Sequence, residues 1–424
     1  MSTIRPVYVV AGNRIPFAKS MTKYLGLSTQ DLMTAALKAL VDKTKLQGKT
    51  VGDVALGAIM QNPKDWNLTR ECVQGSGLHA HTPGYNVQRA CGTGLETSWQ
   101  IANKIALGHI NEGISGGVDT NSDLPITVSS NLKKALLHMN AARSIGDKLK
   151  ILATIRPKDL APSFPAVGEP RTGMSMGQHT EKMVQKWKID RKSQDELALA
   201  SHQRAAKAWA DGFHSDLVSS FHGLDKDTIV RGDTTLEKLS RLKPAFDFTG
   251  IGTLTAGNSS PLTDGASCVL LASEESAKEH GWDLQARFVD CEVAALDYVG
   301  GDGLLMAPTI AVAKLLQRQG FKLQDFDFYE IHEAFAGQVL CTLKAWNDEA
   351  WCKRLLGQAP LGEIDLTKLN INGSSLAIGH PFAATGGRIV SSLAKMIKTS
   401  GKQRGLISIC TAGGMGIAAI LERV

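Results

Sequence analysis

Two cysteines and two histidines have side chains that could do chemistry, and they share one setting in the sequence. Cys91, His332, His380 and Cys410 each lie at the C-terminal end of a predicted strand, next to small residues or a helix start. Open α/β sheets build their functional sites from the loops at these strand ends. If the four residues meet there, one thiol can act as a nucleophile with acid and base partners beside it.

Cys91 belongs to the stretch Gly84–Asp119, which predicts a strand over 85–89, a tight turn and a helix over about 94–106. A thiol at that helix start faces unpaired backbone N–H groups and the positive end of the helix macrodipole, which predicts thiolate in preference to thiol. Gly92 and Gly94 allow the sharp bend and leave the sulfur uncrowded. The alternative is a buried small hydrophobic residue. This stretch alone does not decide between the two.

The other three residues also have structural alternatives. His380 could be a turn residue before Pro381, His332 could be a core histidine, and Cys410 could be a small buried residue before a glycine turn. The second half of the chain repeats the order of the first: AIMQN corresponds to EIHEAF, RACGTGLETS to LAIGHPFAATG, and SGGVD to ICTAGG. Two such halves packed about a pseudo-twofold axis would bring the corresponding loops together. This favours a chemical role for these residues over the structural alternatives.

Predicted strands and helices alternate along most of the chain, which indicates a parallel or mixed α/β sheet. The predicted strands cover 6–11, 51–60, 85–89, 113–119, 288–294, 326–332 and 406–410, and the predicted helices cover 27–46, 70–79, 94–106, 176–187, 193–209, 308–319 and 382–398. We predict an N-terminal half over 1–120 that is completed by about 250–275, an inserted loop domain over 121–249, and a C-terminal half over 276–424.

Composition narrows the class of protein. The chain has 424 residues, 43% hydrophobic and 21% charged, which suits a globular protein of two or three domains. The net charge of +6 fits weak attraction to anions but is no nucleic-acid signature. Seven cysteines without C-x-x-C spacing argue against disulfides and a metal site, and they predict a reducing compartment. With no recognised leader or membrane-length apolar run, we expect the cytoplasm.

Residues 131–158 form a predicted helical segment that is strongly basic. Only Asp147 opposes its positive side chains, which are Lys133, Lys134, Arg143, Lys148, Lys150, Arg156 and Lys158. One interpretation is a solvated face. The other is a surface for phosphate, acidic lipid or a partner subunit, including peripheral contact with a membrane.

Five ordered motifs resemble those of the thiolases, the acyl-CoA C-acyltransferases: ACGTG, TAGNSSPLTDGAS, HEAFA, GHPFAATGGR and CTAGGMG. They span essentially the whole chain. Many members have Asn-Glu-Ala-Phe where this chain has His332 followed by Glu-Ala-Phe, and this variant is most similar to thiolases of bacterial fatty-acid β-oxidation and to β-subunits of trifunctional complexes. The resemblance implies a five-layered αβαβα fold of two duplicated βαβαβαββ halves with an inserted helical loop domain.

The resemblance also implies roles for individual residues. Cys91 would be acylated, His380 would take its proton, and Cys410 would carry a proton to and from the α-carbon. The backbone N–H groups of Cys91 and Ala412 would form one oxyanion hole, and Nε2 of His380 with His332 would form another. The positions that match coenzyme A contacts are Arg231, Phe246, Ser260 and Met176.

The implied reaction is thiolysis of a 3-ketoacyl-CoA by CoA, giving acetyl-CoA and a shortened acyl-CoA through an acyl-cysteine, or the reverse condensation. Alternatives are a biosynthetic acetoacetyl-CoA-forming thiolase, a decarboxylating ketosynthase-like enzyme, and a non-catalytic CoA- or lipid-binding protein. CoA would be a substrate, with no tightly bound cofactor and no metal. Expected partners are a second copy, as a homodimer or dimer of dimers, and a hydratase/dehydrogenase α-subunit.

Overall fold

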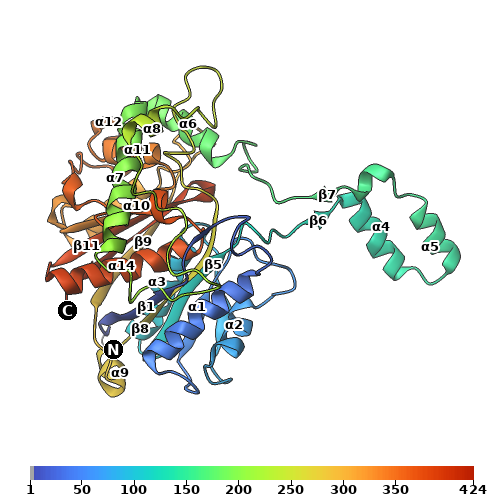
Figure 1. Cartoon of the computed structure of the whole chain (residues 1–424), viewed down its shortest axis with the longest axis horizontal. Coiled ribbons are helices and arrows are strands. Elements are labelled where there is room, and N and C mark those ends of the chain that lie inside the picture. The colour runs from blue at the N-terminus through green and yellow to red at the C-terminus, as the bar shows by residue number, and fades with distance from the viewer. Residues whose placement is uncertain (1–3) are drawn as a thin grey trace. The chain divides into compact units, whose positions relative to one another are not determined.

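The computed structural model describes residues 4–424, which divide into two compact units. The larger unit contains the residues up to Asp123 together with Gly168–Val424, and the smaller is Leu124–Val167. Figure 1 labels helices and strands of both where there is room. Residues 168–249, which the sequence assigns to an insert over 121–249, cluster with the larger unit because α6 (Met176–Trp187) and α7 (Arg191–Ala210) pack on helices of the second half.

The larger unit is built on one ten-stranded mixed sheet with the order β10-β11-β12-β9-β1-β8-β5-β3-β4, and β2 pairs with β8. Only three residue pairs, between Val7–Val9 and Ala286–Phe288, join its two halves. The strands are β1 (Val7–Arg14), β2 (Ala18–Lys19), β3 (Asp53–Leu56), β4 (Gly84–Asn86), β5 (Glu112–Asp119), β8 (Thr263–Ala272), β9 (Ala286–Ala295), β10 (Phe328–Ile331), β11 (Arg404–Thr411) and β12 (Met415–Glu422).

Helices cover the sheet in layers that the buried side chains define. One core packs α1 and α2 against β1, β3, β5 and β8, a central core encloses α3 and α14, and a third packs α10 and α11 against β9–β12. The remaining helices of this unit are short or peripheral. The bounds are α1 (Thr29–Thr44), α2 (Leu68–Ser76), α3 (Thr93–Ala106), α8 (Leu236–Ser240), α9 (Glu274–His280), α10 (Pro308–Gln319), α11 (Ala336–Trp346), α12 (Glu349–Trp351), α13 (Ser375–Ile378) and α14 (Ala384–Ser400).

The predicted duplication is confirmed by the strand order. β1-β8-β5-β3 in the first half corresponds to β9-β12-β11-β10 in the second, and α3 precedes β5 as α14 precedes β11. The counterpart of β4 is reduced to a single parallel bridge between Tyr329 and Leu369. Figure 1 shows the blue and cyan elements of the first half on one side and the orange and red elements of the second half on the other, and α3 packs against α14. The five-layered α/β arrangement is therefore confirmed.

The smaller unit is a helical hairpin closed by a two-stranded ribbon. β6 (Thr127–Val128) pairs antiparallel with β7 (Pro162–Ser163), and between them lie α4 (Ser130–Ala141) and α5 (Ile145–Leu152). Ser129 and Ser144 cap the two helices. Ala135 is the single buried residue of α4 and α5, so this unit has little core. No helix among residues 4–424 is long and apolar enough to cross a bilayer.

Candidate active site

Cys91 lies in the turn between β4 and α3, which is where the sequence places it. The turn is held by Thr93, whose hydroxyl accepts from the Arg89 N–H at 2.9 Å and donates to the Ala90 carbonyl at 2.7 Å. Ala90 adopts a left-handed backbone with φ of 44°, which marks a tight, strained turn. Cys91 is the one cysteine among residues 4–424 that keeps partial exposure, and the other six are buried free thiols.

Two glycines allow the backbones of α3 and α14 to touch, and this contact brings the two corresponding loops together. A Cβ added at Gly94 would lie 2.7 Å from the Ala383 carbonyl oxygen and from the Gly387 nitrogen. One added at Gly386 would lie 2.1 Å from the Leu95 nitrogen. Any side chain would therefore push apart the helix starts that carry the Cys91 and His380 loops.

Replacing Gly386 by alanine is expected to lower the free energy of unfolding by about 3 kcal/mol, because the added methyl meets backbone that cannot move aside. Urea denaturation followed by circular dichroism measures the change. Gly146→Ala is the control, since its Cβ would have only the Ser144 hydroxyl within reach, at 3.9 Å, and it should leave stability unchanged or slightly raised. Equal stability of Gly386→Ala and the wild type would contradict the helix contact.

His380 follows Gly379, whose φ of 110° suits glycine and turns the chain out of α13. The His380 N–H donates to Thr263 Oγ1 at 2.8 Å, and its Nδ1 is 2.6 Å from Thr385 Oγ1. Asp119, at the end of β5, accepts from the N–H of Ala383 at 2.9 Å, so the end of the first-half strand is tied to the His380 loop. These contacts fix the ring with its Nδ1 edge occupied and its Nε2 edge available.

His332 follows β10 and lies against His380, with ring centroids 4.1 Å apart. Its backbone N–H donates to the Ser408 carbonyl at 2.8 Å, and its Nδ1 is 2.8 Å from Ser375 Oγ. The imidazole is fully buried, and among residues 4–424 no group hydrogen-bonds to its Nε2. A buried polar atom without a partner costs stability, so the free Nε2 is a candidate for contact with a ligand.

Cys410 is 2% exposed and pairs with Gly416 near the end of the β11–β12 ladder. Burial raises the pKa of the Cys410 thiol well above its ordinary value, and the charge of the nearby Cys91 raises it further. The chain then turns through Gly413, which has a φ of 76°. Glu169 accepts from the Gly413 N–H at 3.0 Å and so holds this turn in place.

The electrostatics of Cys91 differ from the sequence-based expectation of a thiolate. Removal from water raises the pKa of the Cys91 thiol to about 12, although the backbone N–H groups of Ala412 and of Cys91 itself lower it. The negative charges of Asp119 and Glu169 raise it further. The prediction of a resting thiolate is therefore wrong, because desolvation and two carboxylates outweigh the helix start.

Both imidazoles are neutral in this setting. Burial, followed by the charge of Arg388, lowers the pKa of His380 to about 3. Burial, His380 and Arg388 together lower the pKa of His332 well below its ordinary value. A neutral imidazole can take a proton from a neutral thiol as the sulfur attacks, so these protonation states are compatible with a thiol nucleophile and a histidine base.

The predicted CoA-contact residues divide into two groups. Met176 and Phe246 belong to the same apolar cluster as Cys410, and the Phe246 ring meets Phe335 edge to face at a centroid distance of 5.8 Å. The Ser260 N–H donates to the Ala334 carbonyl at 3.0 Å. Arg231 is exposed, two residues after Ile229, whose side chain lies beside Gly379. The first three therefore adjoin the cysteine–histidine cluster, and Arg231 lies on the surface near it.

Sequence reasoning missed several polar residues that hold the site. Asp119 and Glu333 are buried carboxylates inside motifs that were recognised, so their position in the motif was the available signal. Glu333 accepts from Ser201 at 2.7 Å and from Asn370 at 2.7 Å, and burial raises its pKa. Glu169 and Ser375 carried no signal, because only the folded chain brings them to the site.

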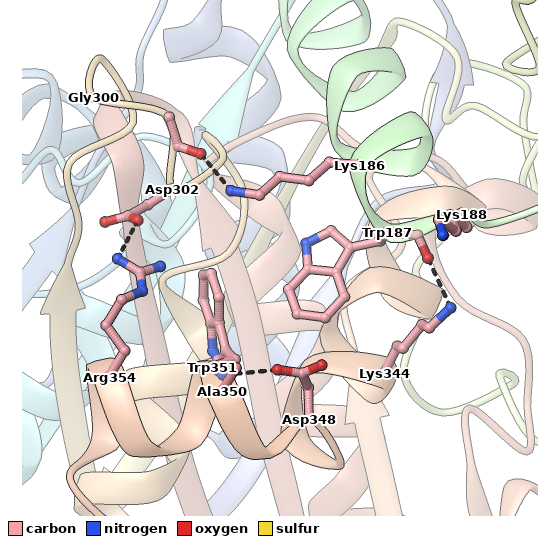
Figure 2. Close-up of a pocket in the computed structure, with 11 residues that line it drawn as sticks. Lys186, Trp187, Lys188, Gly300, Asp302, Lys344, Asp348, Ala350, Trp351 and Arg354 are labelled. Atoms are coloured by element: carbon pink, nitrogen blue, oxygen red, sulfur yellow. Dashed lines mark hydrogen bonds and ion pairs between the residues drawn. The ribbon is translucent and has the colours of Figure 1, made fainter.

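A cavity also lies away from these residues. It has a volume of about 590 Å³ and is lined by basic and aromatic side chains from the end of α6, the 300–302 loop and the 344–354 region (Figure 2). Three of its cations are already held. Lys186 donates to the Gly301 carbonyl at 2.9 Å, Lys344 donates to the Trp187 carbonyl at 2.8 Å, and Arg354 pairs with Asp302 at 2.7 Å. No predicted site residue lines it. Residues 4–424 contain no cluster of three or more metal-ligating side chains.

The duplicated α/β fold, with cysteines and histidines at its strand ends, defines the class of protein to which the chain belongs. Residues 7–275 match the family described as thiolase, N-terminal domain, and residues 282–423 match thiolase, C-terminal domain. The chain belongs to the thiolase family and is an acyltransferase.

Individual relatives extend over nearly the whole chain. A 3-ketoacyl-CoA thiolase from a Shewanella species is 40% identical over 423 residues, covering 98% of this chain and 96% of its own, and one from Aliivibrio fischeri is 41% identical, covering 98% and 95%. The crystal structure of human mitochondrial 3-ketoacyl-CoA thiolase in complex with CoA matches with a TM-score of 0.82 at 28% identity over 100% of this chain and 99% of that one. Bacillus anthracis acetyl-CoA acetyltransferase has a TM-score of 0.82 at 29% identity, with 100% of both chains covered.

Proposed function

We propose that this protein catalyses the thiolysis of 3-ketoacyl-CoA by CoA, giving acetyl-CoA and an acyl-CoA two carbons shorter, and that it serves fatty-acid β-oxidation in the cytoplasm. The observation that carries the proposal is that the Cys91 thiol lies by the Ala412 N–H and the Cys410 thiol, while contacts of α3 and Asp119 with the start of α14 bring the loop of the paired neutral imidazoles His380 and His332 toward it. The names of the relatives support the substrate class. CoA enters as a substrate, with no tightly bound cofactor.

The first half-reaction forms the acyl-cysteine. His380 takes the Cys91 proton as the sulfur attacks the 3-keto carbon, and the negative oxygen is stabilised by Nε2 of the histidine pair. The bond between C2 and C3 breaks with its electrons going to C2. Cys410 donates its proton to C2, and acetyl-CoA leaves. The raised pKa of Cys410 suits this step, because the thiol stays protonated until a strongly basic carbanion forms.

The second half-reaction transfers the acyl group to CoA. The Cys410 thiolate takes the proton of the incoming CoA thiol, whose sulfur attacks the acyl-Cys91 carbonyl. The backbone N–H groups of Cys91 and Ala412 stabilise the negative oxygen, as their position at the sulfur suits. The Cys91–acyl bond breaks, and His380 returns its proton to the sulfur. Met176, Phe246, Ser260 and Arg231 are the residues proposed to hold CoA.

The proposal predicts ping-pong kinetics across a series of 3-ketoacyl-CoA chain lengths, because one cysteine carries the acyl group between the two substrates. Parallel lines in double-reciprocal plots at several CoA concentrations are the expected result. Intersecting lines would contradict the acyl-enzyme route. The series also separates the degradative role from an acetoacetyl-CoA-forming thiolase, for which only the four-carbon substrate would be turned over efficiently.

A decarboxylating ketosynthase-like enzyme is the second candidate, and Cys410 disfavours it. That reaction obtains its carbanion from loss of CO₂ and needs no second thiol beside the nucleophile. Here the Cys410 sulfur lies next to Cys91 at the end of β11. A homodimer or dimer of dimers, and a complex with a hydratase/dehydrogenase α-subunit, complete the proposal for partners.

The Leu124–Val167 unit is proposed to dock on an anionic membrane surface. Its helices expose large apolar side chains, including Leu137 at 61%, Ile145 at 79% and Leu149 at 60%. Among the described residues, the single ion pair in this unit joins Arg156 to Asp159, which leaves its other basic side chains free of carboxylate partners. Apolar and basic side chains on one small helical unit suit an anionic interface.

Reversing four charges of this unit, Lys133, Lys134, Lys148 and Lys150 to glutamate, is expected to reduce binding to phosphatidylglycerol vesicles by about 100-fold or more, because each lysine contributes about 1 kcal/mol near such a surface. Vesicle co-sedimentation measures it, with neutral phosphatidylcholine vesicles as reference. The control reverses four exposed lysines of the larger unit, Lys23, Lys49, Lys322 and Lys402. Unchanged vesicle binding would make the basic segment a solvated face, and loss of co-purifying α-subunit instead would make it a subunit interface.

A further inference from the structure

The two ring nitrogens of His332 differ in their hydrogen bonding. Its Nδ1 is 2.8 Å from the hydroxyl of Ser375, at the start of α13, while Nε2 is buried without a hydrogen-bond partner among the described residues. A neutral imidazole carries its proton on one nitrogen only, and the partner of the held nitrogen decides which. Ser375 therefore decides whether Nε2 of His332 carries the proton.

Arg388, on α14, controls Ser375 in turn. Its Nη2 lies 3.0 Å from Ser375 Oγ and 3.3 Å from Ser374 Oγ. A guanidinium only donates hydrogen bonds, so Ser375 Oγ accepts from Arg388. The hydroxyl hydrogen of Ser375 is then free, and the His332 Nδ1 is the acceptor within reach.

The reverse assignment leaves a polar group unpaired. If Nδ1 carried the proton, Ser375 Oγ would accept from both His332 and Arg388, and its own hydrogen would have no acceptor. Ser375 and His332 are fully buried, so water is not available to take it. An unpaired buried donor of this kind is costly, which makes the reverse assignment the less stable one. The two donor–acceptor contacts therefore favour a proton on Nε2 of His332.

We propose that Arg388 and Ser375 are positioning residues that hold neutral His332 in the tautomer with its proton on Nε2, so that this N–H donates to the negative oxygen formed on the substrate. The statement about the substrate oxygen rests on the function proposed above. In the other tautomer a lone pair of Nε2 would face that oxygen and repel it. The positioning relay from Arg388 through Ser375 therefore decides whether His332 stabilises or destabilises the negative oxygen.

Arg388 also supports the neutral state of both rings. It is 2% exposed and lies near two buried carboxyl groups, Glu330 and Glu333, both of which raise its pKa, although burial lowers it to about 10. Its positive charge lowers the pKa of His332 and of His380. One guanidinium thus disfavours imidazolium at both positions while it orients the serine.

The test compares two neighbouring serines. Ser374 and Ser375 are both fully buried and both accept from Arg388, but only Ser375 contacts His332. Nitrogen-15 NMR of histidine-labelled protein, with the His332 signal assigned from its absence in His332→Asn, reports the tautomer without any substrate. Wild type and Ser374→Ala are expected to show a proton on Nε2, and Ser375→Ala a mixture of the two tautomers.

Kinetics provide the second reading. Ser375→Ala is expected to lower kcat for thiolysis by about 10- to 100-fold with KM nearly unchanged, as loss of an orienting hydrogen bond typically does. Ser374→Ala should stay within about twofold of wild type. Arg388→Lys, which keeps a donor, should retain the tautomer that Arg388→Met loses, with circular dichroism confirming that both are folded.

Two results would overturn the inference. One is a proton on Nδ1 of His332 in the wild type, and the other is an unchanged tautomer in folded Ser375→Ala. Because the tautomer is read in the resting protein, it is independent of the proposed reaction. A protein with the expected tautomer response but no thiolysis would refute the function and leave the positioning relay standing.

Discussion

Replacing Cys91 by alanine is expected to lower thiolysis by about 10⁴-fold or more and to abolish the acyl-enzyme, because no other group at the site can carry the acyl chain. Cys410 adjoins Cys91 but is buried, whereas Cys91 keeps partial exposure, so Cys410 is a poor substitute nucleophile. Intact mass after incubation with acetyl-CoA measures the result. Wild type should gain one acetyl group, and Cys91→Ala none.

Cys341→Ala is the matched control for this experiment. Cys341 is also a free thiol in the second half of the chain, fully buried in α11, and burial raises its pKa. The control should therefore be acetylated like the wild type. Acetyl transfer to Cys91→Ala at the wild-type level would show that another residue is the nucleophile.

Replacing Cys410 by alanine is expected to slow cleavage of the C2–C3 bond much more than acyl transfer to Cys91. The variant should still form acetyl-Cys91 from acetyl-CoA, because the Cys91 thiol, the His380 base and the Ala412 N–H are untouched and the leaving CoA thiolate needs a proton donor far less than a carbanion does. Thiolysis of a 3-ketoacyl-CoA should fall by about 10³-fold, since the carbanion at C2 then has no proton donor and general acid–base catalysis contributes 10²- to 10⁴-fold. Mass spectrometry follows the first reaction and loss of 3-ketoacyl-CoA absorbance the second.

The outcome that would contradict this role is an equal loss of both reactions. Equal loss would mean that Cys410 shapes the pocket around Cys91 rather than moving a proton. Cys410→Ser refines the reading, because a hydroxyl keeps a protonated group of similar size at the end of β11. Partial recovery of thiolysis in that variant supports the proton-transfer role.

Much of the fold was predictable because its signals are local. The bounds of α6 and α10 equal the predicted ranges 176–187 and 308–319. Each helix begins at a clear capping residue or proline and ends at a helix stop. The duplication was also visible in corresponding motifs, and the strand order confirms it. The division of the insert was not visible, because whether 168–249 packs on α11 and α13 depends on contacts far apart in sequence.

The sequence by itself determined which residue types are available: a cysteine at a helix start, two histidines and a second cysteine at strand ends, and glycines where α3 and α14 meet. The tertiary structure decided their chemical state. Burial makes the pKa of the Cys91 thiol about 12 and that of His380 about 3, against the thiolate that the helix start alone predicts. It also placed Ser375 and Arg388 behind His332. Desolvation and long-range hydrogen bonds depend on which surfaces the folded chain brings together, and local sequence does not specify that.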